Sequence, residues 1–400
     1  MEVLKMELMK TKKLYDLDAY AIEFEAEVLS CEEVKCTAKS GEEKLCYEVV
    51  LDQTLFFPEE GGQTPDQGFL GSAEVLDVQI KGDVITHYVS KGFEIGAVVT
   101  GNIDWKHRFF NMQQHSGEHL FSGLAYRKHG LKNVGFHLSN QIVTMDFDKA
   151  LSEEELKEME WEINEAIVAN VEIKTGYPSK EELAVLEYRS KIEIEGAIRI
   201  VEIPGYDICA CCAPHVHRTG EIGMFKIQNV QNYKGGMRIS FLCGFRALEE
   251  YRRKSEIISN LSGLLTTNQE NIAEHVGKLK TQVQSLKTQL SSAKQALMEG
   301  RIAEIPQEQK DVLLFEQDID TPVMRAVVNK LVEMHDGVCG IFVGDEERGY
   351  NFIIGSKNVD CRDVAAKLRE KLNARGGGKV PMIQGSVAAS EDKIRDTIMG

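Results

Sequence analysis

Apolar and polar residues alternate over short runs from residue 1 to about residue 90, the pattern that predicts half-buried β-strands. Three such runs, AYAIEFEAEVLSCE, KLCYEVVLDQT and AEVLDVQIKGDVITHYV, are punctuated by Gly, Asp and Lys. Between the last two runs, Gly61 and Gly62 suit a tight loop, while Pro58 and Pro65 exclude a helix. We therefore expect this part of the chain to be mainly β.

The apolar period becomes that of an amphipathic helix over residues 104–130, and Gly130 is a suitable end for that helix. A second helix is predicted over residues 152–170, because Ser152-Glu-Glu-Glu155 has the pattern of a capping box. Strand-like runs surround both helices. Together they predict an α+β unit that ends near residue 250.

Residues 255–300 carry a different pattern, with apolar residues alternately four and three positions apart over about four heptads. The repeat consists of Ile272, Val276, Leu279, Val283, Leu286, Leu290, Ala293 and Leu297. Lys, Gln, Ser and Thr dominate outside the repeat, so its apolar stripe is narrow. We expect a coiled coil or a helical hairpin that ends at Pro306, rather than a helix lying on its own domain.

The C-terminal part of the chain, residues 306–400, predicts a small α/β domain. Strand-like VLLFEQ, VCGIFVG and YNFIIGS alternate with helical VMRAVVNKLVEM and CRDVAAKLREKLN. A predicted loop over residues 375–379 (RGGGK) then leads into PMIQGS. No internal sequence repeat is evident.

Composition narrows the class of protein. The chain has 400 residues, room for two or three domains, and contains no apolar run long enough to span a membrane. Residues 1–7 lack the apolar stretch of a secretory signal, so we expect a cytoplasmic protein. A net charge of −16 argues against a general nucleic-acid-coating protein. Residues 367–379 nevertheless carry five basic residues against one acidic one, which on charge alone fits a solvated helix face.

The nine cysteines include three within four residues, Cys209, Cys211 and Cys212. A disulfide framework is not expected in a cytosolic chain of this size, so the cluster indicates metal binding or redox chemistry. On the first predicted helix, His115 and His119 share one face because they are four residues apart.

A Cys-x-x-x-His motif, formed by Cys211 and His215, follows in a segment that Pro214 makes a loop. Its loop conformation lets both side chains converge on the helix that carries the two histidines. Thiolate and imidazole together suit zinc. We therefore predict a zinc site with the ligands His115, His119, Cys211 and His215.

Two alternatives remain open on spacing alone. Four protein ligands are typical of a closed structural zinc, whereas a catalytic zinc usually keeps an open position, and Cys209 or Cys212 could replace one of the four. The spelling His115-Ser-Gly-Glu118-His119 also matches the H-x-x-E-H motif of inverted zinc peptidases, in which the glutamate is the general base. Such a peptidase needs an acidic third ligand, for which residues 153–165 offer glutamates.

Four spaced motifs resemble a known family, the free-standing alanyl-tRNA editing proteins of the AlaX type in their long form. The motifs are Gly61-Gly-Gln63, the His115–His119 pair, the Cys211–His215 pair and Thr219-Gly-Glu-Ile-Gly223. They are similar to the editing domain of alanyl-tRNA synthetases. The heptad region and the Gly376-Gly-Gly378 tail resemble the DHH-associated C-terminal domain of those enzymes.

The resemblance implies zinc-dependent hydrolysis of serine, and sometimes glycine, from tRNA of alanine specificity. A synthetic pocket that fits alanine cannot strongly exclude an added hydroxyl, and a second site removes the error. Glu118 and Gln63 would be the catalytic residues. Glu118 departs from the family, which typically has threonine there, and Cys211-Cys-Ala-Pro-His215 departs from Cys-Gly-Gly-Thr-His. Our hypothesis is that Glu118 orders the attacking water or a zinc ligand.

The resemblance also implies an architecture and partners. We expect an α+β protein with a β-rich, barrel-like domain (1–92), a zinc editing domain (93–250), a helical connector (251–305) and a DHH-associated domain (306–400). We expect a homodimer through the heptad helix or the last domain. The predicted tRNA contacts are Lys367, Lys371, Arg375, Gly376, Gly377, Gly378 and Lys379. The competing functions are a zinc peptidase and a non-catalytic tRNA- or protein-binding module with structural zinc.

Overall fold

The structure is a computed structural model that describes residues 10–37, 43–140, 142–190 and 196–400. Residues 1–7, which lack the pattern of a secretory signal, lie outside these residues. The fold is mixed α+β, as predicted, and separates into two compact units, residues 1–257 and 258–400. Within the described residues, no helix is long and apolar enough to cross a membrane.

The first unit begins with a closed six-stranded barrel in the order β2-β3-β7-β6-β5-β8. Alternate residues of its strands, such as Val49, Val78 and Ile85, fill the interior because side chains alternate between the two faces of a strand. A short strand β1 (Lys12–Lys13) pairs in parallel with β4 (Gln53–Thr54) beside the barrel. The barrel strands are β2 (Glu23–Thr37), β3 (Glu43–Leu51), β5 (Gly68–Leu70), β6 (Ala73–Lys81), β7 (Val84–Val89) and β8 (Val98–Ile103).

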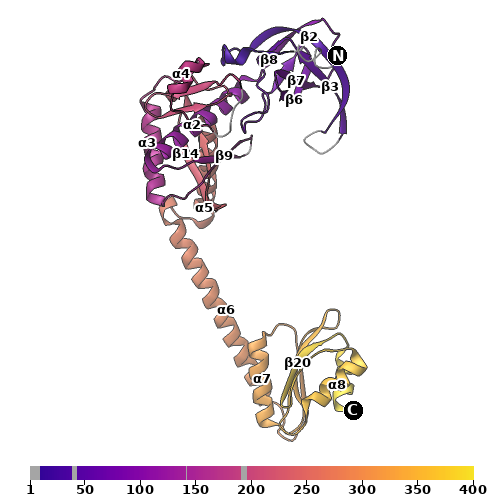
Figure 1. Ribbon diagram of the computed structural model, residues 1–400. Coiled ribbons are helices and arrows are strands. Elements are labelled where there is room, and N and C mark those ends of the chain that lie inside the picture. The colour runs from indigo at the N-terminus through magenta and orange to yellow at the C-terminus, as the bar shows by residue number, and fades with distance from the viewer. Residues whose placement is uncertain (1–9, 38–42, 141, 191–195) are drawn as a thin grey trace. The chain divides into compact units, whose positions relative to one another are not determined.

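Helix α2 (Trp105–His129) lies at the centre of the rest of this unit, in contact with α3, η2 and strands of two sheets (Figure 1). One sheet has the order β14-β15-β10-β9 and the other β11-β12-β13. The remaining elements are β9 (Asn133–Leu138), β10 (Val143–Phe147), α3 (Glu153–Val168), β11 (Lys174–Gly176), α4 (Lys180–Val185), β12 (Ile200–Ile203), β13 (Asp207–Ala210), η2 (Thr219–Ile222), β14 (Phe225–Tyr233) and β15 (Gly236–Cys243).

Both helices predicted in this region form close to their expected bounds. The side chain of Asp104 caps the start of α2, and Gly130 ends it in the left-handed conformation. Helix α3 begins with the capping box of Ser152 and Glu155. One expectation for α2 differs: instead of one apolar side, every residue from 111 to 125 is buried, including polar ones. A helix that buries polar side chains on several faces must satisfy them internally.

A buried ion pair ties α2 to the loop that follows β4. Arg108 and Asp66 are both almost completely buried, and the guanidinium contacts both carboxylate oxygens. Arg108 also donates to the backbone oxygens of Ala19 and Leu55, while Asp66 accepts the backbone N–H of Phe57. These bonds fix the position of the Gly61-Gly62 loop relative to the helix that carries the histidines.

A disulfide joins Cys36 to Cys46 across strands β2 and β3. This bond differs from the expectation that a cytosolic chain of this size lacks disulfides. Pairing of the two strands brings the cysteines together, with Cα atoms 5.9 Å apart, a separation suited to a disulfide. The cysteines outside this pair are free, including all three of the 209–212 cluster.

The second unit is a five-stranded sheet in the order β16-β17-β18-β20-β19 with helices packed on it. Helix α6 packs against α7 through Met298 and Ile302, which are both buried, and Figure 1 shows α7 beside this end of α6. The elements are β16 (Val312–Glu316), α7 (Thr321–Met334), β17 (Cys339–Asp345), β18 (Gly349–Gly355), α8 (Cys361–Leu372), β19 (Arg375–Lys379), β20 (Met382–Val387) and α9 (Glu391–Met399).

Residues 255–300 fall on two helices, α5 (Gly244–Leu265) and α6 (Ile272–Ala303), with a single 3₁₀ turn, η3 (Gln269–Asn271), before α6. The whole repeat lies on α6, and most of its large apolar residues are between 47% and 64% exposed. The repeat therefore remains an uncovered apolar stripe, on a different side of α6 from Met298 and Ile302.

The predicted loop over residues 375–379 is instead the edge strand β19, paired with β20. Glycine has a low strand propensity, which is why the sequence indicated a loop. The pairing requires glycine at two positions, because a Cβ on Gly376 or Gly378 would lie 2.3 Å from a backbone oxygen of β20.

Candidate metal centre

Helix α2 places His115 and His119 one turn apart and buries both. Close packing around the helix depends on two of its glycines. A Cβ on Gly123 would lie 2.5 Å from the Cβ of Asp207, and one on Gly117 would lie 2.4 Å from the sulfur of Cys243. The absence of these side chains lets neighbouring strands approach α2 closely.

The other two predicted ligands lie in the loop that follows β13. Cys211 leaves the strand with its backbone N–H bonded to the carbonyl of Arg199. The guanidinium of Arg199 in turn donates to the carbonyls of Cys211 and Ala213, at 3.0 and 2.9 Å. This buried arginine therefore holds the loop in the conformation that turns Cys211 and His215 toward α2.

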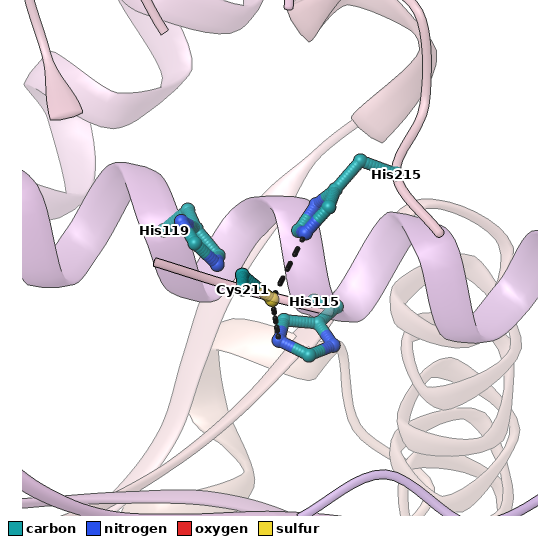
Figure 2. A group of neighbouring side chains, drawn as sticks. All are labelled: His115, His119, Cys211 and His215. Carbon is teal, nitrogen blue, oxygen red and sulfur yellow. Dashed lines mark hydrogen bonds between the residues drawn. The ribbon is translucent and has the colours of Figure 1, made fainter. Parts of the chain in front are cut away.

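The four predicted ligands converge on one point (Figure 2). The sulfur of Cys211 lies 3.5 Å from the Nε2 atoms of both His115 and His215. One ligand atom from each of His115, His119, Cys211 and His215 lies within 4.8 Å of all the others. Three imidazoles and one thiol in this arrangement form a donor set suited to zinc.

Each histidine of the cluster has its Nδ1 atom held by a different buried partner. His115 bonds to Oε1 of Gln63, His119 to Oδ2 of Asp207 and His215 to Oγ of Ser116, all at 2.9 Å. A proton on Nδ1 leaves Nε2 as the metal-binding atom, and metal-ligating histidines commonly show this pattern. The structure thus orients all three rings for a common ion.

The carboxylate of Asp207 is shared between His119 and Arg189. Arg189 donates to both of its oxygens, at 2.7 and 2.8 Å. Burial would raise the pKa of Asp207, but hydrogen bonds from His119 and Arg189 and their charges lower it. Burial would likewise lower the pKa of His119, yet the bonds to Asp207 and Cys211 raise it to about 9. Asp207 is therefore an ionised carboxylate that supports a cationic centre.

Electrostatics at the other ligands also favour a metal. Burial would raise the pKa of the Cys211 thiol, but the charge of His115 and hydrogen bonds from His115, His119 and His215 hold that pKa well below its usual value. Burial lowers the pKa of His215 to about 3, although Cys211 opposes this effect. A thiolate and a neutral imidazole are the forms that bind metal.

Glu118 is fully buried beside the cluster. Its Oε1 atom accepts hydrogen bonds from Ser122 and from the amide of Asn133, each at 2.6 Å. Its Oε2 atom lies 3.9 Å from Nε2 of His119. The carboxylate is thus held firmly in place, close to the position that a metal would occupy.

Gln63 is also fully buried, and its Nε2 atom has no hydrogen-bond partner within the described residues. The backbone of the Gly61-Gly62 loop reaches β9 closely, since a Cβ on Gly62 would lie 2.3 Å from the oxygen of Phe136. This approach brings Gln63 to His115. The motif that resembled an editing domain therefore has a local function as the support of a ligand.

The cluster opens into a cavity of about 1020 Å³. His115, His119 and Cys211 form one part of its wall, and the Gly61-Gly62 loop forms another. Its further lining includes Phe136, Tyr177, Arg199, Lys10, Lys13 and Cys212. A cavity of this volume can hold a ligand much larger than an amino acid.

The structure brings together all four predicted ligands and both predicted catalytic residues. Cys209 belongs to a second group of possible ligands with His119 and Asp207, whereas Cys212 belongs to neither group. Besides His115 and His119, the cluster contains the thiol of Cys211 and the imidazole of His215. An inverted zinc peptidase would instead use a carboxylate from residues 153–165 as its third ligand.

Sequence reasoning missed the supporting residues Ser116, Arg189, Arg199 and Asp207. Ser116 is next to His115 on the predicted helix and could have been considered for that reason. No local sequence signal marks Arg189, Arg199 or Asp207. The predicted tRNA contacts all lie in the second unit, with Lys367 and Lys371 on α8 and residues 375–379 exposed along β19.

Comparison with known proteins places this site in a class. Residues 198–240 match the family described as "Threonyl and Alanyl tRNA synthetase second additional domain", and residues 2–107 match "tRNA synthetases class II (A)". The first match includes β12, β13 and the loop with Cys211 and His215. Both matches are to families of tRNA synthetase domains, so the site lies in a region similar to those enzymes.

Full-length relatives give the family. The chain is 31% identical over 379 residues to alanyl-tRNA editing protein Aarsd1 of Danio rerio, with 92% of each chain covered. It is 28% identical to Aarsd1-A of Xenopus laevis at the same coverage. An alanine–tRNA ligase of Ignicoccus hospitalis is 27% identical over 92% of this chain and 40% of the ligase. The chain belongs to the alanyl-tRNA editing protein family, which confirms the resemblance seen in the motifs.

Proposed function

We propose that the protein is a zinc-dependent hydrolase that removes serine, and possibly glycine, from mischarged tRNA of alanine specificity. The observation that carries the proposal is the arrangement of three imidazoles, each held through Nδ1, around the thiol of Cys211 at the wall of a large cavity. Membership of the alanyl-tRNA editing family supports the ester of an aminoacyl-tRNA as substrate.

The residues of the cluster fit zinc because imidazole and thiolate are borderline-soft donors. When bound, zinc supplies a Lewis acid that polarises the ester carbonyl or activates water. Four protein ligands leave room for this only if the coordination expands to five or one ligand leaves. His115, His119 and Cys211 line the cavity, so a substrate carbonyl would approach from their side.

Glu118 and Gln63 take different roles in this proposal. The Oε2 atom of Glu118 lies close enough to His119 to accept a proton from water beside the metal, as a general base requires. Gln63 is fully buried and bonds to His115. We therefore assign Gln63 as a positioning residue that fixes the His115 tautomer, rather than as a group that touches substrate.

The second unit is proposed to bind tRNA along β19. Its residues 375–379 are all exposed, and its glycines allow a phosphate backbone to approach the strand closely. Lys367, Lys371, Arg375 and Lys379 would supply the positive charge for such contacts. We further propose that the protein is cytoplasmic and has four parts: a barrel-like domain (1–92), a zinc editing domain (93–250), a helical connector (251–305) and a DHH-associated domain (306–400).

Helix α6 is proposed to form a parallel two-stranded coiled coil with a second copy. Val276 and Val283 occupy a positions, and Leu279 and Leu286 occupy d positions, a combination that favours parallel dimers. In that orientation glutamines at g positions face lysines at e positions. An antiparallel pair would instead oppose lysine to lysine, which is unfavourable.

Deacylation assays test the function directly. The protein is incubated with Ser-tRNA, Gly-tRNA and Ala-tRNA of alanine specificity, with and without a chelator. We expect loss of the serine ester but not the alanine ester, inhibition by the chelator and recovery with added zinc. If every ester stays intact while zinc is bound, the protein is a binding module with structural zinc.

A further inference from the structure

We propose that Lys13 binds the phosphodiester that precedes the terminal adenosine of the aminoacyl-tRNA. The inference rests on the proposed function and extends it from the ester to the nucleic-acid chain that carries it. The proposed contact lies on the side of the cavity formed by strand β1, which is distant in sequence from all four candidate metal ligands.

The cavity is larger than its amino-acid cargo requires. A volume of about 1020 Å³ corresponds to a pocket for a drug-sized ligand, whereas a seryl group has only a few heavy atoms. The space beyond the metal cluster must therefore accommodate what the amino acid is attached to, a ribose, a base and the adjoining phosphodiester.

Three cationic side chains line this space, and two of them already have partners. Lys10 forms an ion pair with Asp83 at 2.9 Å. Arg199 donates to two backbone carbonyls of the ligand loop and lies 3.4 Å from a carboxylate oxygen of Asp16. Lys13 is the third, and the structure shows it no ion pair among the described residues.

Lys13 is held in a fixed position in the wall of the cavity that the His115, His119 and Cys211 side chains also line. Its strand pairs with Thr54 of β4, and the preceding Thr11 bonds through its hydroxyl to the carbonyl of Leu51. The side chain is half-buried in the cavity wall. Cys212, the residue that follows candidate ligand Cys211, lines the same cavity as Lys13.

The chemistry of this position suits a phosphate. A lysine ammonium is a compact charge with three donors, and a partly desolvated ammonium gains a strong charge-assisted bond from an anionic oxygen. Tyr177 lines the same cavity and is half-exposed, which offers a ring against which a base can stack.

Three serine esters of increasing size test the inference on the full chain with zinc bound: seryl-adenosine, which lacks the phosphodiester, seryl-CpA, which contains one, and Ser-tRNA. The variant is Lys13→Gln. Its matched control is Lys12→Gln, the exposed neighbour on the same strand, whose side chain points to the opposite face.

We expect Lys13→Gln to raise the KM for seryl-CpA and Ser-tRNA about tenfold, the value of one charge-assisted hydrogen bond, with kcat unchanged. The KM for seryl-adenosine should stay the same. The slope of log KM against log salt concentration should fall by about 0.7 for the two larger esters, as expected for one lost phosphate contact on a single strand.

An equal rise in the KM for seryl-adenosine, or an equal rise in the KM for seryl-CpA with Lys12→Gln, would overturn the inference and leave the proposed function intact. An unchanged KM for seryl-CpA would overturn it as well. If the unaltered protein hydrolyses none of the three esters, the proposed function itself is wrong and the inference fails with it.

Discussion

The Oδ2 atom of Asp207 accepts the Nδ1–H of His119 at 2.9 Å while Arg189 holds the same carboxylate from its other side. This contact spans 88 residues of sequence and joins β13 to α2. It keeps the ring of His119 in the orientation that points Nε2 toward Cys211, and it places a buried negative charge behind the ligand. Its role can be measured without an activity assay.

We expect Asp207→Asn to weaken zinc affinity ten- to hundredfold, the usual effect of losing the partner of a metal-bound histidine. Competition with a chromophoric chelator measures this affinity. The control is Glu202→Gln, which removes a carboxylate from the adjacent strand β12 outside the ligand cluster. Equal zinc affinity in Asp207→Asn and the unaltered protein would show that the carboxylate only packs.

Neighbouring cysteines provide a second, matched test. Cys211→Ser should lose most bound zinc because it removes the thiolate at the centre of the cluster. Cys212→Ser should retain zinc, since this residue belongs to neither group of possible ligands. Metal content per chain, measured by elemental analysis after dialysis, distinguishes the two. Retention of zinc by Cys211→Ser and its loss from Cys212→Ser would reverse the assignment.

Replacing Glu118 by glutamine tests its proposed role as a base. The amide oxygen can still accept the bonds from Ser122 and Asn133, so zinc content should not change. The rate of Ser-tRNA deacylation should fall about a hundredfold, a typical contribution of a general base. A full rate with unchanged zinc content would exclude this role, and a parallel loss of zinc would make Glu118 a support of His119 instead.

The apolar stripe of α6 predicts a change of oligomeric state. The double variant Leu279→Glu, Leu286→Glu introduces charges at two d positions, and we expect it to sediment as a monomer where the unaltered chain sediments as a dimer. Gln284→Glu adds a charge to the same helix outside the repeat and should remain dimeric. A monomeric unaltered chain would contradict the coiled-coil proposal.

His87 gives the barrel a specific dependence on acid. It is fully buried, donates from Nδ1 to the carbonyl of Val49 and bonds through Nε2 to the hydroxyl of Thr54. Burial lowers its pKa from 6.5 to about 4. As the pH falls, His87 therefore takes up a proton in the unfolded chain before it does so in the folded chain. The contribution of neutral His87 to the free energy of unfolding is complete above pH 6.5 and decreases toward pH 4.

The expected loss from His87 is about 2 kcal/mol between pH 7 and pH 5. Urea unfolding of the first unit, followed by tryptophan fluorescence, measures it. Comparison with His87→Gln isolates this residue from the other groups that titrate in the same range. The variant should lose less stability over that interval by about the stated amount, and identical pH slopes would contradict the burial argument.

Local signals in the sequence were sufficient for helices α2 and α3 and for the cluster of candidate ligands. The capping box at Ser152 and the glycine at 130 gave the helix ends, because both act through neighbouring backbone groups. The convergence of His115, His119, Cys211 and His215 could be predicted because metal binding restricts residue type and spacing together.

Features that depend on contacts between distant segments could not be predicted in the same way. Arg189 and Asp207 reach the metal cluster through pairing of β13 with its neighbours, and no local motif marks them. The glycines of β19 indicated a loop because strand propensity is weak there, whereas pairing with β20 decides the conformation. The disulfide between Cys36 and Cys46 likewise follows from the register of β2 and β3.

The candidate ligands come from one helix and from one loop 96 residues further along the chain. An ion bound to both would act as a cross-link, so that metal binding and folding share one free energy. At a zinc concentration one hundred times the Kd, the folded first unit would gain about 2.7 kcal/mol. The supply of zinc in the cell would then govern how much of the protein stays folded and escapes proteolysis. Under the proposed function, the amount of folded protein would in turn set the capacity for tRNA deacylation.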